Sequence, residues 1–298
     1  MALGEKALHA SDERPSGDPP DFAVAMAFTY DYAEMAAGLL ARVRQYHPLA
    51  DLFLFTDEES YSAAKTLANA FSATDLRLAS IRDYPCGDWN SIVTAKFDIF
   101  GLSYADPILF LDTDQILYRE LTNFIEKFAN SGAALAGSAD DESFADQFKP
   151  GAALDGIAAD APCINTGAFM IRADASLYRR VVKSLDYFAG RGRLPTQSVI
   201  NGLAQIDRLP ILLFGEDFMA GPFSAPVLHF PRTSALLHFW TPRPPFMKPN
   251  PIRQGEISYE VLKRKFSDTF GEEYPEEQLR LEYVEQLQSA RQTWKCGS

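Results

Sequence analysis

Short apolar runs alternate with segments of helical spacing through the first 117 residues of the chain. The apolar runs predict β-strands, and the segments between them, whose apolar residues recur at helical spacing, predict α-helices. The ranges expected as strands are 21–32, 51–58, 74–81 and 107–114, and those expected as helices are 33–48, 60–71 and 90–103. Because strands joined through helices pair in parallel and place helices on both faces of a sheet, we expect an α/β fold with a mostly parallel central sheet flanked by helices.

The rest of the chain follows this pattern less regularly. Further strands are expected at 133–141 and 163–174, further helices at 176–190, 196–205 and 276–292, and a loop at 142–160. Residues 209–250 are aromatic and rich in proline, so we expect them to be irregular. The chain is expected to divide into a disordered tail at 1–20, one domain at 21–250 and a helical extension at 251–298.

The composition is that of a protein with a large apolar core, since 47% of the 298 residues are hydrophobic and 23% are charged. The formal net charge of −12 argues against a nucleic-acid partner, because binding phosphates requires a basic surface. The 3 cysteines form no CxxC pair, so we expect neither a disulfide framework nor a structural zinc site, and a reducing, cytoplasmic compartment fits best. The start of the chain lacks the apolar stretch of a signal peptide, and no segment reaches the roughly 18 apolar residues of a transmembrane helix.

The strand expected at 107–114 ends on two carboxylates, Asp112 and Asp114, one residue apart. Aspartate is common in turns, so a solvated strand end is the simplest interpretation. In a parallel sheet, however, ligands bind beyond the carboxyl ends of the strands, which is where these aspartates fall. Two carboxylates there are suited to a hard cation such as Mg²⁺ or Mn²⁺, which takes its remaining ligands from water and a diphosphate.

Two classes of enzyme place a DxD motif after an apolar strand. In haloacid-dehalogenase-type phosphatases the motif lies near the N-terminus and reads like D-x-D-G-T/V. Here Gln115 and Ile116 follow Asp114, and about a hundred residues with three expected strands come before it. This class is therefore the alternative.

Five segments of the chain form a second pattern, and in order they are FTYDY (28–32), AKFDIFGLSYADPILFLDTDQIL (95–117), NTGAFMIR (165–172), TQSVIN (196–201) and LLHFWTPRPPFMKP (236–249). Together they resemble glycosyltransferase family 8 of the GT-A fold, which includes glycogenin and bacterial lipopolysaccharide galactosyltransferases, and this family is the better match. The last four are similar to the family's lysine-bearing helix with its hhhLDxD strand, its N-S/A-G-hhhI block, its D-Q-x-x-hN helix start and its HFxGxxKPW segment. The resemblance spans roughly residues 22–250 and implies the fold of a nucleotide-diphospho-sugar transferase.

The resemblance implies a role for each residue that matches a family motif. Asp112, Asp114 and His238 would bind Mn²⁺ or Mg²⁺, and Asp114 would also be catalytic. Gln197 and Asn165 would lie beside the transferred sugar as further catalytic residues. The residues implied to bind the nucleotide sugar are Thr29, Tyr30, Tyr32, Lys96, Thr113, Thr166 and Lys248.

The chain departs from the family pattern at three places. Thr196 stands where the family has the aspartate of its DQ pair, so the motif does not fix the donor sugar. The inserted TPRPP (241–245) lengthens the spacing before Lys248. Two HF pairs occur, at His229 and His238, and we prefer His238 because a Lys-Pro pair follows it.

Some of these residues also have a purely structural interpretation. Lys96 on an amphipathic helix is ordinarily a solvated or snorkelling residue, and His238 taken alone would be a hydrogen-bonded core residue. Tyr30 and Tyr32 would pack under a loop. Asp140 would belong either to an acidic loop or to the neighbourhood of the acceptor.

The function expected from the sequence is therefore a metal-dependent glycosyltransferase. It would move a hexose from a UDP-linked sugar to an unidentified saccharide, lipid-linked glycan or protein, with the retention of configuration that the resemblance implies. The alternatives are a haloacid-dehalogenase-like phosphatase and a noncatalytic nucleotide-sugar binding protein.

Overall fold

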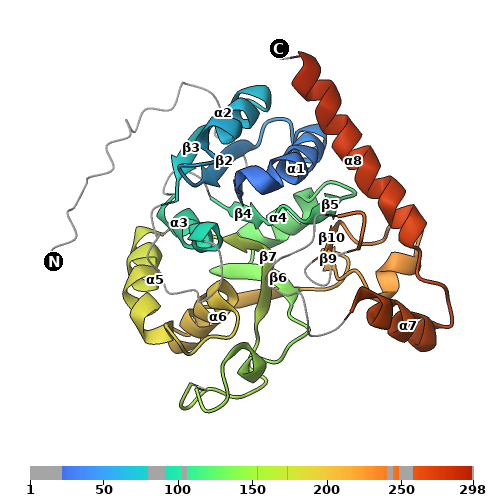
Figure 1. Ribbon diagram of the computed structural model, residues 1–298. Coiled ribbons are helices and arrows are strands. Elements are labelled where there is room, and N and C mark those ends of the chain that lie inside the picture. The colour runs from blue at the N-terminus through green and yellow to red at the C-terminus, as the bar shows by residue number, and fades with distance from the viewer. Residues whose placement is uncertain are drawn as a thin grey trace.

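The computed structural model describes residues 22–79, 91–102, 106–152, 154–172, 174–239, 244–247 and 258–296 (Figure 1). The tail expected at 1–20 and the expected ligand Lys248 lie outside these ranges. The helices, short 3-10 helices (η) and strands are β1 (Ala23–Ala27), η1 (Tyr30–Tyr32), α1 (Ala33–Tyr46), β2 (Asp51–Thr56), α2 (Tyr61–Ala70), β3 (Asp75–Leu78), η2 (Ser91–Thr94), α3 (Ala95–Asp98), η3 (Ile99–Gly101), β4 (Ile108–Leu111), β5 (Gln115–Leu117), α4 (Thr122–Ala129), β6 (Leu135–Ala139), η4 (Ala145–Gln147), β7 (Ile164–Ile171), α5 (Ala175–Phe188), α6 (Pro195–Ile206), β8 (Ile211–Phe214), β9 (Met219–Ala220), η5 (Ala225–Leu228), β10 (Leu236–His238), α7 (Tyr259–Phe270) and α8 (Glu276–Cys296).

The central sheet has 7 strands in the order β3-β2-β1-β4-β7-β6-β8. β7 runs antiparallel to its neighbours β4 and β6, and every other neighbouring pair is parallel. The expected mostly parallel α/β sheet is confirmed. Because β1 and β4 are parallel neighbours, the residues that follow them meet at the same edge of the sheet.

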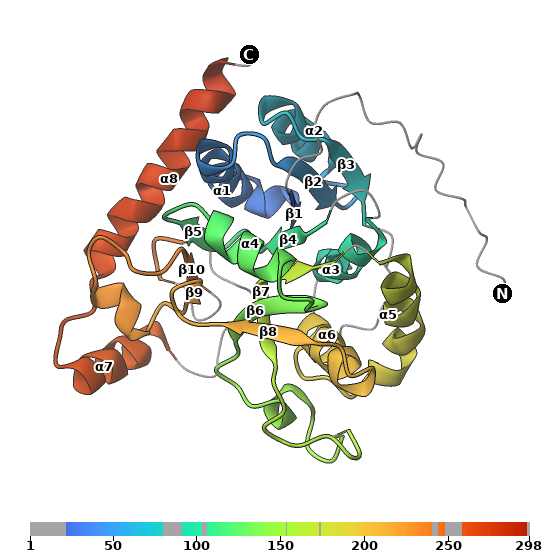
Figure 2. The ribbon, with the colours of Figure 1, turned by 180° about the vertical axis from the view of Figure 1, so that it is seen from behind.

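Both faces of the sheet are buried, which explains why its strands are apolar at successive positions and not only at alternate ones. Val24 and Met26 of β1 belong to one core, with side chains from α1, α2 and α4. Ala23 and Ala25 of the same strand belong to the core on the opposite face, with side chains from α3, α5 and α6. Figure 2 shows these helices on the two sides of the sheet. The loops at the strand ends are thereby left free to form a site.

A second sheet of 3 strands has the order β5-β10-β9. β8, β9 and β10 all lie within residues 209–250, so the expectation of an irregular segment is wrong at these three short strands. These strands have only 4, 2 and 3 residues, too few for a periodic pattern to show in the sequence. Pairing with distant segments holds them, since β10 pairs with β5 and β8 with β6.

Two expected elements differ from the structure. The helix expected at 90–103 is broken into η2, α3 and η3, and the β-branched Ile92 and Thr94 at its start explain this, because such residues have low helix propensity. The strand expected at 21–32 ends at Ala27 and continues into η1. In addition, the predicted helices include neither α4 nor α7, although Ser258 caps the start of α7 and Gly271 adopts a left-handed conformation (φ 68°) at its end.

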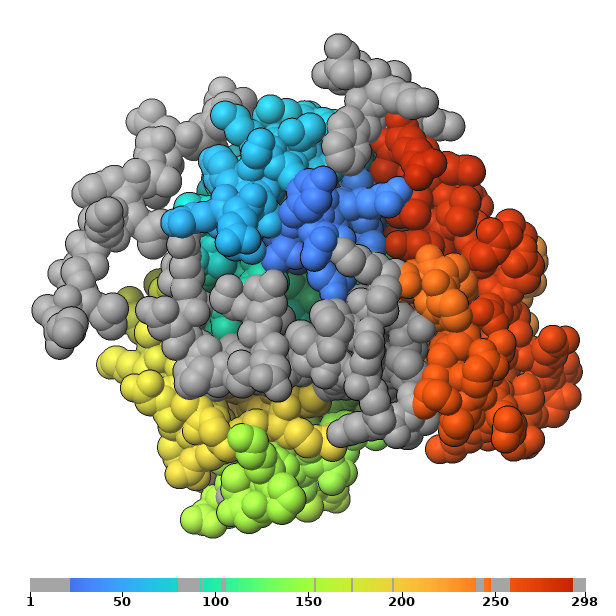
Figure 3. All heavy atoms as spheres, viewed as in Figure 1, coloured from blue at the N-terminus to red at the C-terminus, as the bar shows by residue number. Residues whose placement is uncertain are grey.

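The helix α8 packs along α1 and reaches the small sheet. Its buried side chains, Leu279, Tyr283, Gln286 and Ala290, recur every three or four residues and form one face. Figure 3 shows α8 and α7, in red and orange, covering one side of the molecule next to the blue α1. Within the described residues, no helix has both the length and the apolar composition that crossing a bilayer requires.

Candidate metal centre and active site

Three side chains able to bind a metal ion converge beyond the carboxyl end of β4. Asp112 directly follows β4, Asp114 directly precedes β5, and His238 is the last residue of β10. The Asp112 N–H donates to the carbonyl of Gly167 in β7 (2.7 Å), and the Asp114 carbonyl accepts from the N–H of Phe239 (2.9 Å). These bonds tie the first aspartate to the central sheet and the second to the small sheet, so the chain bends between them.

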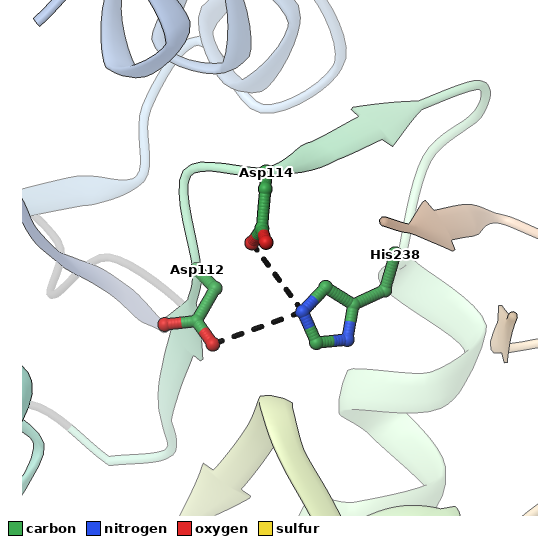
Figure 4. Close-up of side chains that lie close together, drawn as sticks. All are labelled: Asp112, Asp114 and His238. Carbon is green, nitrogen blue, oxygen red and sulfur yellow. Dashed lines mark ion pairs between the residues drawn. The ribbon is translucent and has the colours of Figure 1, made fainter. Parts of the chain in front are cut away.

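Figure 4 shows both carboxylates directed toward the His238 ring. The Nε2 atom of His238 lies 3.3 Å from Oδ1 of Asp114 and 3.8 Å from Oδ2 of Asp112. One ligand atom from each of the three residues lies within 4.8 Å of the others. Asp114 and His238 are buried, whereas Asp112 is partly exposed. Two carboxylates and one imidazole thus form a compact group whose most accessible member is Asp112.

The His238 ring packs directly on the backbone of Gly167. A Cβ atom at position 167 would lie 2.1 Å from Cε1 of His238 and 2.3 Å from its Nδ1, so only glycine leaves room for the ring. Nδ1 is buried and has no hydrogen-bond partner among the described residues. Within the described part of the chain, packing on Gly167 and not a second hydrogen bond therefore turns Nε2 toward the aspartates.

Lys96 is buried next to Asp112. Its Nζ lies 2.7 Å from Oδ2 of Asp112, 3.0 Å from the carbonyl oxygen of Thr166 and 5.2 Å from the centre of the Phe110 ring. Burial raises the pKa of Asp112, and the charge of Lys96 acts in the opposite direction. The interpretation of Lys96 as a solvated residue is therefore wrong, because its ammonium group faces the site.

The donor set fits a divalent cation. Two carboxylates and one lysine leave a negative charge at the site, which a cation bound by Asp112 and Asp114 would balance. Carboxylate oxygens suit Mg²⁺ and Mn²⁺, and the imidazole of His238 favours a transition-metal ion such as Mn²⁺. Three protein ligands would leave room in the coordination sphere of such an ion for water and phosphate oxygens.

A second polar cluster lies at the end of β6. Asp140 accepts hydrogen bonds from Nε2 of Gln197 (2.6 Å) and Nε2 of Gln147 (2.9 Å), and Nδ2 of Asn165 lies 3.4 Å from it. Oε1 of Gln197 accepts from the backbone N–H of Thr166 (3.1 Å). Burial raises the pKa of Asp140 to about 6, although the hydrogen bond from Gln147 acts to lower it.

β7 joins the two clusters. The N–H of Thr166 bonds to Gln197 while its carbonyl accepts from Lys96, and Oδ1 of Asn165 accepts from the N–H of Gly167 (2.9 Å). The structure thus brings Asn165, Thr166 and Gln197 together, as the sequence motifs imply. Asp140 is not part of those motifs. The signal for it is a strand that ends on acids, as β4 does.

Four of the residues expected to bind the nucleotide sugar lie on the segments that follow β1 and β4. The side chains of Thr29 and Thr113 are buried, and Tyr30 is 70% exposed. Tyr32 is partly buried and packs against the core around α1 and against the core of the small sheet. Of these four residues, Tyr30 offers the most accessible surface.

The choice between the two histidines follows from the geometry. His238 meets the aspartates, whereas His229 is exposed at the end of η5. Thr196, in the place of the family's aspartate, is buried in the first turn of α6.

No protein-family model matches the chain, and no curated protein matches it significantly. Solved structures do match it. The WbbM bifunctional glycosyltransferase is similar with a TM-score of 0.58 and 12% identity, over 91% of this chain and 53% of that one. The galactosyltransferase LgtC, in complex with donor and acceptor sugar analogs, is similar with a TM-score of 0.57 and 14% identity, over 87% of this chain and 99% of that one. The glycosyltransferase GlyE of Streptococcus pneumoniae gives 0.52 and 16%, over 83% of this chain and 60% of that one.

The chain thus spans about half of WbbM and nearly all of LgtC. Identities this low show a shared fold and do not show a shared substrate. The chain has the GT-A fold of these glycosyltransferases, as the sequence resemblance implies.

Proposed function

We propose that the protein is a metal-dependent glycosyltransferase that takes a hexose from a UDP-linked sugar. The observation that carries this proposal is the convergence of Asp112, Asp114 and His238 beyond β4, in a fold shared with solved glycosyltransferases. The buried Lys96 adds a positive charge at the same place. A site with this arrangement of charges is suited to a diphosphate.

Asp112, Asp114 and His238 would hold Mn²⁺, with Mg²⁺ as the alternative. When bound, the ion stabilises the negative charge that develops on the β-phosphate oxygen as the bond to the sugar breaks. Lys96 supplies a second positive charge that is already in place, so little reorganisation is needed. Lys248 is proposed to contact the diphosphate as well.

The nucleoside would bind at the carboxyl ends of β1 and β4. Met26 of β1 pairs with Leu111 of β4, so the loop that carries Tyr30 begins beside Asp112. The exposed ring of Tyr30 is available to stack on a base. The polar residues proposed to complete the pocket are Thr29, Tyr32, Thr113 and Thr166.

Gln197 and Asn165 would contact the transferred sugar. The amide of Gln197 is fixed at both ends, by Asp140 and by the N–H of Thr166, so it presents one orientation to a ligand. Asp140 also places a carboxylate beside Gln197, where the family has the aspartate that Thr196 replaces here. We propose that Asp140 takes the place of that missing carboxylate.

Transfer is proposed to retain configuration. The bond between the anomeric carbon and the β-phosphate oxygen breaks, and the acceptor hydroxyl bonds to the same face of that carbon. Its proton passes to the leaving phosphate oxygen, so no separate protein base is required. NMR of the first-formed glycoside tests this step, and an inverted anomer would contradict it.

Calorimetric titration of UDP, with Mn²⁺ and then with EDTA, tests the donor site. We expect binding that depends on the metal and is lost in Asp114→Ala with the fold intact. A panel of UDP-sugars, scored for release of UDP, then identifies the donor. Unchanged UDP binding in the folded Asp114→Ala variant would refute the ligand assignment.

The two alternatives predict other results in the same assays. A phosphatase would release inorganic phosphate from small phosphoesters, and a noncatalytic binding protein would bind UDP with metal and show no turnover with any acceptor. The proposed enzyme releases UDP at a rate that increases with acceptor. The fold shared with glycosyltransferases favours the transferase.

A further inference from the structure

The strand β5, which follows Asp114, has a free edge in the small sheet. Backbone groups of alternate residues in a strand point to opposite edges. The carbonyl of Asp114 accepts from the N–H of Phe239, and the N–H of Tyr118 donates to the carbonyl of Ala235, each at 2.9 Å. Phe239 and Ala235 flank β10. Those of Gln115 and Leu117 therefore point away from β10, to an edge where the described sheet has no further strand.

The side chain of Gln286 in α8 occupies this edge. Its Nε2 donates to the carbonyl of Gln115 (2.8 Å), and its Oε1 accepts from the N–H of Leu117 (3.0 Å). A primary amide offers both a donor and an acceptor, so one side chain replaces the backbone of a neighbouring strand. Gln286 is 0% exposed, and solvent therefore cannot replace its amide without local opening.

Contacts nearby fix the position of α8 along its own axis. One turn before Gln286, Oε2 of Glu282 accepts from the hydroxyl of Tyr118 (2.7 Å) and from Nε of Arg232 (3.0 Å). On α1, a Cβ at Gly38 would approach a side chain of α8 at 3.0 Å, so glycine there permits the close packing of the two helices. The amide of Gln286 is thus delivered to β5 by a helix that cannot slide freely.

β5 in turn connects two of the three proposed metal ligands. Asp114 precedes it directly, and Gln115 pairs across the sheet with His238. We infer that Gln286 is a positioning residue of the metal centre, acting through β5 to hold Asp114 and His238 at coordinating distance. The inference rests on the proposed metal site.

Gln286→Leu tests the inference, because leucine has a similar size and makes neither hydrogen bond. Gln288→Leu is the matched control, since Gln288 is exposed two positions further along the same helix. The affinity for Mn²⁺ alone is measured from the electron paramagnetic resonance signal of the free ion, and folding is measured by thermal unfolding. We expect Mn²⁺ affinity to fall about 10- to 100-fold in Gln286→Leu, as for other residues that orient metal ligands, and to stay unchanged in Gln288→Leu.

Gln286→Asn covers the case in which the leucine variant does not fold. It keeps the amide but is one methylene shorter, so it cannot make both bonds, and a loss of Mn²⁺ affinity is again expected. Wild-type affinity in either folded variant overturns the inference alone. Absence of Mn²⁺ binding in the wild-type protein, with or without UDP, overturns the proposed function itself.

Discussion

Replacing Gly167 by alanine tests the geometry of the metal centre at its tightest contact. The added Cβ would lie 2.1 Å from Cε1, 2.3 Å from Nδ1 and 2.7 Å from Nε2 of His238. An ordinary contact between carbon atoms is about 3.5 Å, so the ring would have to move by about 1.4 Å. Position 167 does not have a positive φ, and alanine is therefore compatible with the backbone.

A shift of this size would remove His238 from the proposed metal coordination sphere, because metal–ligand distances tolerate only about 0.2 Å. The ring is buried, so it cannot swing into solvent to relieve the overlap. We expect metal-dependent UDP binding to weaken about 100-fold or more, with a cost in stability of about 1–3 kcal/mol from overpacking. The loss of binding should therefore exceed what the loss of stability explains.

The assay is calorimetric titration of UDP in the presence of Mn²⁺, together with the unfolding temperature of each variant. Gly101→Ala is the control, since the nearest atoms that a Cβ there would meet, among the described residues, belong to the ring of Tyr178 at 3.6 Å, an ordinary contact distance. We expect this control to bind like the wild type. Wild-type affinity in a folded Gly167→Ala protein would show that His238 is not a ligand or that the packing is not as described.

Three further predictions concern the charges around the site. Asp140→Ala leaves the Nε2 of Gln197 without its 2.6 Å partner. We therefore expect kcat for sugar transfer to fall about 10- to 100-fold while the affinity for UDP in the presence of Mn²⁺ is unchanged. A fall in this affinity with kcat unchanged would contradict the prediction. The pKa of Asp140 is raised from 3.8 to about 6, so its protonated form stabilises the fold below about pH 4 and this contribution is lost as pH rises through 6. Between about pH 4 and pH 6 the wild-type protein should therefore lose more stability than the Asp140→Asn variant. The difference between the two losses is at most about 3 kcal/mol, and less because solvent screens the charge. Equal pH profiles of the unfolding temperature in the two proteins would refute the raised pKa of Asp140. Lys96→Met leaves the carboxylate of Asp112 without its 2.7 Å partner, at a cost in stability of about 1–3 kcal/mol. Because a bound cation would replace the missing positive charge, Mn²⁺ should raise the unfolding temperature more in this variant than in the wild type. An equal or smaller increase would contradict the role of Lys96.

The sequence predicts the part of the fold whose elements are long and whose pattern is local. The strands before Asp112 and the helices α1 and α2 follow from apolar periodicity. The pair Asp112 and Asp114 follows from its position at the end of a buried strand. Only the resemblance to a family places His238 and Gln197 beside these aspartates, because local sequence patterns do not predict contacts between residues so far apart in the chain.

The remaining features depend on contacts between distant segments. β9 and β10 exist because they pair with one another and with β5, and no propensity of two or three residues predicts such strands. Asp140 gains its role only through Gln147 and Gln197, which lie on other elements. In the sequence, Gln286 is one polar residue in a charged helix, and only the structure shows that it is buried against a strand edge.

The late position of Gln286 in the chain has a consequence for folding during synthesis on the ribosome. His238 is synthesised after both aspartates, and residue 286 follows 48 positions later (286 minus 238), which takes roughly 2 to 10 s at ordinary rates of synthesis. A β5 strand formed in that interval would have the bare edge that Gln286 of α8 covers in the structure. A nascent chain interrupted before α8 would then carry all three proposed metal ligands and still bind the ion weakly.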